Sequence, residues 1–132
     1  MIQFPFKSGQ IIKTEAYTFA SMPVMYHFGL VLKEKDQIYI IHNDRKNGTI
    51  KQSYEDFIYN EGDVRKVSEV KRSKLENLTN NEIITRFNKC AGDFHWLDYN
   101  CEHFVDCMLK NKIRSEQINL YALTAITLII LL

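Results

Sequence analysis

The segment from residue 26 to residue 42 constrains the fold more than any other, because it reads as two strands joined by a short polar turn. Residues 26–32 (YHFGLVL) and 37–42 (QIYIIH) are rich in aromatic and β-branched residues. The four residues between them, 33–36, are all charged. Two such runs joined by a short loop predict an antiparallel hairpin.

Further strand-like segments lie on both sides of this hairpin. Residues 11–19 are rich in apolar residues, and residues 49–53 follow an Asn-Gly turn signal. Residues 64–67 and 94–98 are two more short candidates. The segment from 54 to 78 is highly charged and shows no clear period. We therefore expect a sheet of several short strands.

Two helices are expected after most of the strands. Thr79 and Glu82 form a capping-box pattern, and the helix that they open carries an apolar stripe ending near Gly92. Asn100 is a good N-cap for a second helix over residues 101–110. Strands followed by helices predict an α+β fold in which an antiparallel sheet packs against helices.

Size and charge exclude several classes of protein. A chain of 132 residues fits one domain. Its net charge of +1 argues against a nucleic-acid binder held by a basic surface. Three cysteines, an odd number, argue against a disulfide framework, and the N-terminus lacks the features of a secretory signal. These features predict a small intracellular domain with reduced thiols.

The C-terminal segment differs from the rest of the chain. Residues 118–132 (INLYALTAITLIILL) carry no charge. As a helix these 15 residues would extend about 22 Å. They are fewer than the roughly 20 residues that span a bilayer comfortably. Three basic residues just upstream could meet anionic headgroups: Lys110, Lys112 and Arg114. We expect a domain over residues 1–114 and a membrane anchor, as an apolar tail helix, over 115–132. The alternative is a buried helix or strand of the domain.

The hairpin also brings two histidines together. A four-residue loop at 33–36 and a two-residue loop at 34–35 both place His27 directly opposite His42, with Cβ atoms about 5 Å apart. A loop with an odd number of residues would displace the pair. By itself, a cross-strand histidine pair is more often a packing feature than a functional one.

Cys101 is expected at the first position of the second helix. Free backbone N–H groups and the helix dipole favour a thiolate there, and only the thiolate attacks readily. A histidine beside it would activate it, and a second histidine could orient that base. Cys101, His27 and His42 therefore form a chemically sensible triad. Taken alone, Cys101 reads as a small buried apolar residue.

A metal site is the less favoured interpretation of the cysteine-rich region. Five possible ligands fall within 18 residues: Cys90, His95, Cys101, His103 and Cys107. Their spacing contains no Cys-x-x-Cys pair, which weakens a structural zinc site. We expect Cys90 and Cys107 in the core and His103 as a support for its helix.

Three blocks of sequence resemble one family in the right order. Residues 100–105 (NCEHFV) resemble the cysteine box of the lecithin:retinol acyltransferase-like (LRAT) domain family, and are most similar to the HRAS-like suppressor phospholipase/acyltransferases. Residues 26–31 (YHFGLV) and 39–42 (YIIH) resemble its two histidine strands. The apolar tail is similar to the membrane anchor of many members. The spacing of the two histidines is longer than in the animal enzymes, and residues 48–78 match no motif.

The resemblance implies a permuted papain-like (NlpC-type) single domain. Cys101 would be the nucleophile that forms an acyl-thioester, His27 the general base and acid, and His42 the residue that orients and polarises His27. The substrate would be a glycerophospholipid acyl ester, and the acyl group would pass to water or to an amine or lyso-lipid acceptor. The resemblance requires neither metal nor organic cofactor.

Two other functions use the same residues. A cysteine peptidase or amidase of the same fold would need the same triad. A non-catalytic, membrane-tethered interaction module would keep the motif for packing. For the acyltransferase, we expect phospholipid as partner, no nucleic acid, and a location on the cytoplasmic face of a membrane through residues 118–132.

Overall fold

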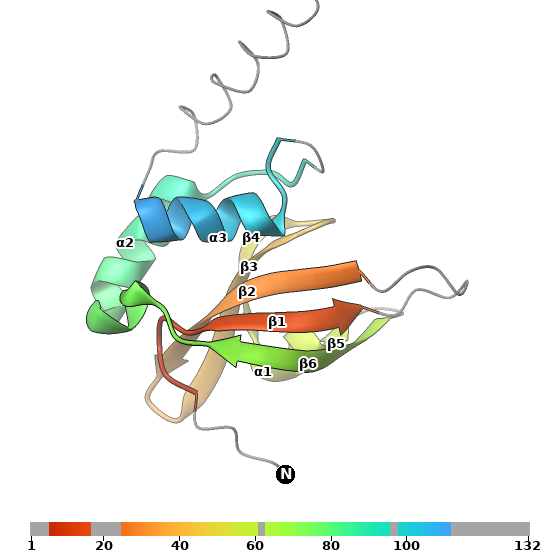
Figure 1. The fold of residues 1–132 in the computed structure, drawn as a ribbon, viewed down its shortest axis with the longest axis horizontal. Helices are drawn as coiled ribbons and strands as arrows, with labels where there is room; N and C mark the ends of the chain where they lie inside the picture. The colour runs from red at the N-terminus through yellow and green to blue at the C-terminus, as the bar shows by residue number, and fades with distance from the viewer. Residues whose placement is uncertain (1–5, 17–24, 61–62, 96–97, 112–132) are drawn as a thin grey trace, which may run out of the picture.

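A six-stranded antiparallel sheet with few helices forms the fold of the computed structural model, which describes residues 6–16, 25–60, 63–95 and 98–111 (Figure 1). The strand order is β4-β3-β2-β1-β6-β5. The strands are β1 (Ile11–Ala16), β2 (Met25–Glu34), β3 (Gln37–Asp44), β4 (Gly48–Ser53), β5 (Tyr59–Asn60) and β6 (Asp63–Lys71). The helices are α1 (Tyr54–Ile58), α2 (Asn80–Cys90) and α3 (Cys101–Lys110), with a 3-10 turn, η1 (Lys74–Asn77). The expected α+β class is confirmed.

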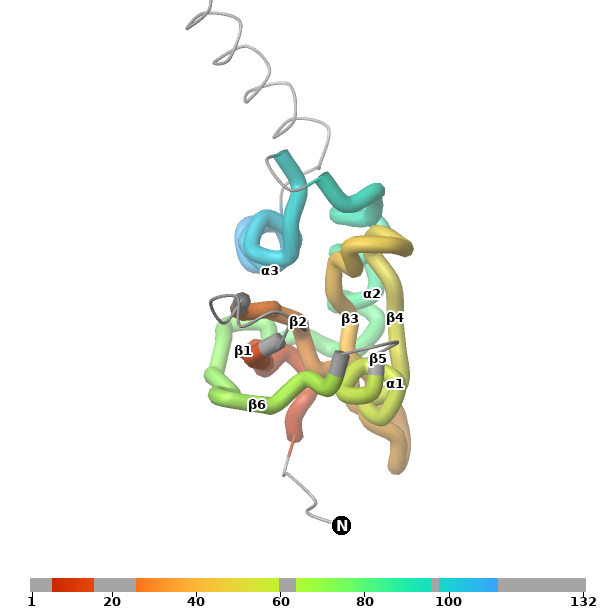
Figure 2. Tube along the Cα trace, turned by 90° about the vertical axis from the view of Figure 1, so that its right-hand side faces the viewer, coloured from red at the N-terminus to blue at the C-terminus, as the bar shows by residue number. Residues whose placement is uncertain are grey.

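The helices lie on opposite faces of the sheet. Figure 2 shows α3 on one side of β2 and β3 and α1 on the other. Side chains alternate between the two faces along each strand, so each face has its own core. The outer core, against α2 and α3, contains Leu30, Leu32, Ile41, Leu75, Ile83, Cys90, Tyr99, Phe104, Val105, Cys107 and Met108. The inner core, against α1, contains Phe6, Ile12, Val31, Ile40 and Phe57.

The hairpin forms as predicted, but its register differs by two residues. Glu34 pairs with Gln37, so the turn is the two-residue loop Lys35–Asp36. Lys35 has a φ of 54°, the left-handed conformation that two-residue hairpin turns favour. As a result Gly29, not His27, lies opposite His42. The expectation that the histidines are directly opposed is wrong, yet a shift of two residues keeps both on one face.

Both long helices begin where the sequence predicts. Thr79 caps α2 through a capping box with Glu82, and Asn100 caps α3. Of the strand expected at 94–98, the described residues show only an isolated bridge between His95 and Tyr99. The segment that showed no period contains α1, β5, all of β6 and η1.

The turn before β4 requires its glycine. Gly48 has a φ of 73°, and a Cβ atom there would lie 2.5 Å from the carbonyl oxygen of Gly92. The space is used by two hydrogen bonds that join β4 to the end of α2. The Thr49 amide donates to the Gly92 carbonyl (2.9 Å), and the Gly92 amide donates to Thr49 Oγ1 (2.9 Å).

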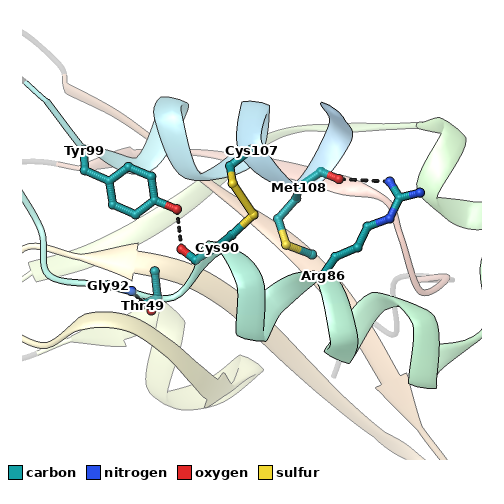
Figure 3. The surroundings of a disulfide bond; sticks show 7 residues. All are labelled: Thr49, Arg86, Cys90, Gly92, Tyr99, Cys107 and Met108. Carbon is teal, nitrogen blue, oxygen red and sulfur yellow. Dashed lines mark hydrogen bonds between the residues drawn. A yellow bond between two sulfur atoms is a disulfide. The ribbon is translucent and has the colours of Figure 1, made fainter. Parts of the chain in front are cut away.

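Cys90 and Cys107 are both fully buried, as expected, but they are joined by a disulfide (Figure 3). The prediction of three reduced thiols is therefore wrong. Cys90 is the last residue of α2 and Cys107 lies within α3. They are on the facing sides of the two helices, with Cα atoms 6.0 Å apart. That separation suits a disulfide. Nearby, Arg86 of α2 donates to the carbonyl of Met108 (3.1 Å) and joins the same two helices.

The C-terminal tail lies outside the described residues. Neither the boundary at 114/115 nor the helix expected at 118–132 is therefore tested. Within the described ranges, no helix has the length and apolar character that crossing a membrane demands.

Candidate active site

Two imidazoles meet on the inner face of the sheet. Nε2 of His27 (β2) lies 2.8 Å from Nδ1 of His42 (β3), and the rings meet edge to face with centroids 5.0 Å apart. The residues are diagonal neighbours across the two strands, a separation that long side chains can bridge. Gly29 helps them to meet, since a Cβ there would lie 2.6 Å from Ile40 Cγ2 and 3.3 Å from the Cβ of His42. The structure therefore brings together two of the three predicted site residues.

A third polar side chain extends this pair. Oε1 of Gln52, on β4, lies 2.7 Å from Nε2 of His42. Gln52 is not among the site residues predicted from the sequence. The signal that could have found it is its place on the strand after His42, because Gln52 pairs with Ile40 and so shares the face of His42. Gln52, His42 and His27 form a continuous hydrogen-bonded row across three strands.

Phe57 and a buried ion pair surround the row. The Phe57 ring of α1 contacts both imidazoles, with centroids 5.9 Å from His27 and 4.9 Å from His42. The guanidinium of Arg65 (β6) lies 4.7 Å from the centre of the same ring and 3.6 Å from a carboxylate oxygen of Asp44. Both members of this ion pair are buried. A positive charge is therefore held close to the histidines.

These surroundings keep both imidazoles neutral. Burial, together with the charge of Arg65, lowers the pKa of His42 to about 4, against the opposing effects of its hydrogen bond with Gln52 and of the Asp44 charge. Burial, and then the charges of Arg65 and His42, hold the pKa of His27 well below its ordinary value. At neutral pH each ring therefore carries one proton and one free lone pair.

Cys101 is the first residue of α3, as predicted. Asn100 Oδ1 accepts from the amides of Glu102 (2.9 Å) and His103 (3.1 Å), and the Asn100 carbonyl accepts from Phe104 (3.0 Å). Of the first-turn amides, only that of Cys101 is left unused by this cap. Cys101 is also the only free cysteine, because the other two are paired.

The predicted thiolate environment is not what the structure shows. Burial raises the pKa of the Cys101 thiol, and this effect outweighs the hydrogen bonds with the backbone of Phe28, Glu102 and Cys101 itself. Desolvation penalises the charged sulfur more than the helix start favours it. At rest the site thus holds a neutral thiol and two neutral imidazoles.

Neighbouring residues on the two strands connect the imidazole pair to the start of α3. His27 is followed by Phe28, whose backbone is hydrogen-bonded to the Cys101 thiol. His42 is followed by Asn43, whose Nδ2 donates to the carbonyl of Tyr99 (2.8 Å), two residues before Cys101. The β2–β3 pairing ends at Gly29, so Phe28 lies where the strands separate. Cys101 thus lies beside the end of the β2–β3 pairing, although no hydrogen bond joins it to either imidazole in the described part of the chain.

The remaining possible ligands have other roles. Nδ1 of His103 accepts from the backbone amide of Asn100 (3.1 Å), which completes the cap of α3 as predicted. His95 is exposed and lies 3.4 Å from Asp98. No group of three or more His, Cys, Asp or Glu side chains that could hold a metal occurs among the residues with described positions.

Comparison of the chain with protein-family models, with curated proteins and with solved structures gave no match.

Proposed function

We propose that this chain is a membrane-associated thiol acyltransferase or phospholipase with a permuted papain-like fold, in which Cys101 is the nucleophile. The observation that carries the proposal is the contact between His27 and His42, beside which the Cys101 thiol is hydrogen-bonded to the backbone of Phe28. A sulfur nucleophile needs a base, and the base needs an orienting group. The NCEHFV block supplies the same assignment by resemblance.

The first half-reaction forms a thioester. The Cys101 sulfur attacks the ester carbonyl carbon of a glycerophospholipid while its proton passes to His27. The carbonyl oxygen becomes an oxyanion, for which the backbone amide of Cys101, which takes no part in the cap of α3, is the candidate donor. When the carbon–oxygen bond to glycerol breaks, His27 returns the proton to the leaving alcohol. The products are a lysophospholipid and an acyl group on Cys101.

The second half-reaction releases the acyl group. Water, or the amine of a phosphatidylethanolamine, attacks the thioester carbon and gives a proton to His27. The carbon–sulfur bond breaks, and the sulfur takes that proton back. His27 is unprotonated in the resting state and can accept a proton, but its lowered pKa and the raised pKa of the Cys101 thiol make the transfer uphill. The proton therefore moves as the sulfur attacks, and no thiolate forms beforehand. Residues 118–132 would hold the site at the cytoplasmic surface of the membrane that supplies the substrate.

The test is to look for the intermediate. The full chain is incubated with phosphatidylcholine vesicles at neutral pH, and Cys101 is examined by intact-mass and peptide mass spectrometry. We expect a hydroxylamine-labile acyl adduct that is absent in Cys101→Ser and strongly reduced in His27→Ala. His95→Ala is the matched control, because His95 is exposed and distant in sequence from the row of polar side chains.

Other outcomes separate the alternatives. Without reductant, alkylating reagents report on Cys101 alone, since Cys90 and Cys107 are joined. If Cys101 is alkylated readily but never acylated by lipid, a peptidase or amidase replaces the lipid enzyme. If it is inert to both, the domain is a non-catalytic module.

A further inference from the structure

The row of three side chains determines which nitrogen of each imidazole carries the proton. An amide oxygen can only accept a hydrogen bond. Oε1 of Gln52 lies 2.7 Å from Nε2 of His42, so that nitrogen must be the donor. A neutral imidazole has one N–H, which leaves Nδ1 of His42 as an acceptor.

The same reasoning extends to the next ring. Nδ1 of His42 lies 2.8 Å from Nε2 of His27, and it can only accept. Nε2 of His27 is therefore protonated, and its Nδ1 holds the free lone pair. The opposite arrangement would place the proton on Nδ1 of His27, which would then have no lone pair there for a proton from the thiol.

We propose that Gln52 is a positioning residue that fixes the tautomers of His42 and His27, and thereby leaves Nδ1 of His27 as the basic nitrogen for Cys101. Within the described part of the chain, the Gln52 side chain is hydrogen-bonded to His42 and not to the sulfur or to His27, so it acts through His42. The importance of His27 Nδ1 rests on the proposed function, whereas the proton positions rest on the geometry alone.

The surroundings support this assignment. The row spans three adjacent strands. Strand pairing holds His42 opposite Gly29, Gln52 opposite Ile40, and His27 opposite Thr14 of β1. Phe57 packs against both imidazoles and limits their rotation. Burial and the charge of Arg65 lower the pKa of both rings and keep them singly protonated at neutral pH.

The experiment is long-range ¹H–¹⁵N NMR of the histidine rings, on the full chain in detergent micelles at pH 8. We expect both His27 and His42 as Nε2–H tautomers in the unaltered protein and in Gln52→Glu, whose carboxylate also accepts. In Gln52→Leu, His42 should become a mixture of tautomers. Gln37→Leu is the matched control, because Gln37 is exposed and its bond is to Tyr39 (2.8 Å).

Acylation rates give the second measurement. We expect Gln52→Leu to form the Cys101 adduct about tenfold more slowly or worse, since general-base catalysis contributes about 10²- to 10⁴-fold, and Gln52→Glu to restore the rate. A proton on Nδ1 of His27 in the unaltered protein would overturn the inference, even if Gln52→Leu failed to fold. Tautomers as expected without any acyl adduct would overturn the proposed function and leave the role of Gln52 standing.

Discussion

The two faces of the sheet differ in what they bury. The outer face packs apolar side chains against α2 and α3, and a disulfide joins the two helices. The inner face has a smaller apolar core and buries two imidazoles and the Arg65–Asp44 pair around Phe57. Buried polar groups are stable only when partnered, whereas apolar packing has no such requirement. We conclude that the outer face mainly holds the fold, while the inner face holds the titratable groups under strict geometric control.

Removal of a large outer-core ring should have the greatest effect on stability. Phe104 is fully buried and packs edge to face on Phe87, with centroids 6.0 Å apart. We expect Phe104→Ala to lower the free energy of unfolding by about 4 kcal/mol, because the cavity is lined by a dense core. Urea unfolding measures it. A loss below about 1 kcal/mol, the range of a surface substitution, would contradict the assignment of stability to the outer face.

The inner ion pair should come next. We expect Arg65→Met to cost about 3 to 4 kcal/mol, since it leaves the buried carboxylate of Asp44 without its charge partner. The change should also raise the pKa of His42, because the charge of Arg65 lowers it. Urea unfolding and NMR titration report the two effects separately. Recovery of stability in Arg65→Met with Asp44→Asn would show that the unpaired charge, and not lost packing, is the cause.

The disulfide should contribute somewhat less. Cys90 and Cys107 are 17 positions apart, and closing a loop of that size stabilises a protein by about 3 kcal/mol. Cys90→Ala with Cys107→Ala should lose that amount in urea unfolding, and only the unaltered protein should respond to reductant. If the bond belongs to the outer face alone, alkylation of Cys101 should keep its rate in the folded double variant.

Acid should weaken the inner face selectively. A histidine whose pKa is lowered on folding stabilises the folded state above its unfolded pKa, and that contribution is lost as the pH falls through the window between the two values. For His42 the window runs from 6.5 down to about 4. Between pH 7 and pH 5 the loss from His42 should be about 2 kcal/mol, with a further loss from His27. His42→Gln should flatten this dependence in urea unfolding. An equal slope in both proteins would show that His42 is not buried in its neutral form.

The smallest effect should come from a surface ion pair of similar chemistry. Nζ of Lys51 lies 2.6 Å from a carboxylate oxygen of Glu34, but both side chains are more than a third exposed. We expect Lys51→Met to change the free energy of unfolding by less than about 1 kcal/mol, because solvent screens exposed charges. The difference between the losses of unfolding free energy in Lys51→Met and in Arg65→Met measures how much burial strengthens an ion pair. Similar losses for the two would remove the contrast between surface and inner face.

Local sequence patterns were sufficient for the elements that local interactions stabilise. The capping residues Thr79 and Asn100 predicted the starts of α2 and α3, and the run of aromatic and branched residues predicted the hairpin. Residues 54–78 are highly charged and show no clear period, so α1 and β5 were not predicted. These short elements form only against the rest of the sheet. In the described part of the segment predicted as a strand at 94–98, only an isolated bridge between His95 and Tyr99 is formed.

The sequence alone determined that His27 and His42 share a sheet face and that Cys101 begins a helix, because strand alternation and capping act over a few residues. Only the tertiary structure decided the register of the hairpin, the addition of Gln52 to the histidine row and the pairing of Cys90 with Cys107. It also reversed the expected pKa shift of Cys101, since burial depends on everything packed around the thiol. Contacts between residues far apart in the chain and the desolvation that they cause are properties of the whole packed molecule.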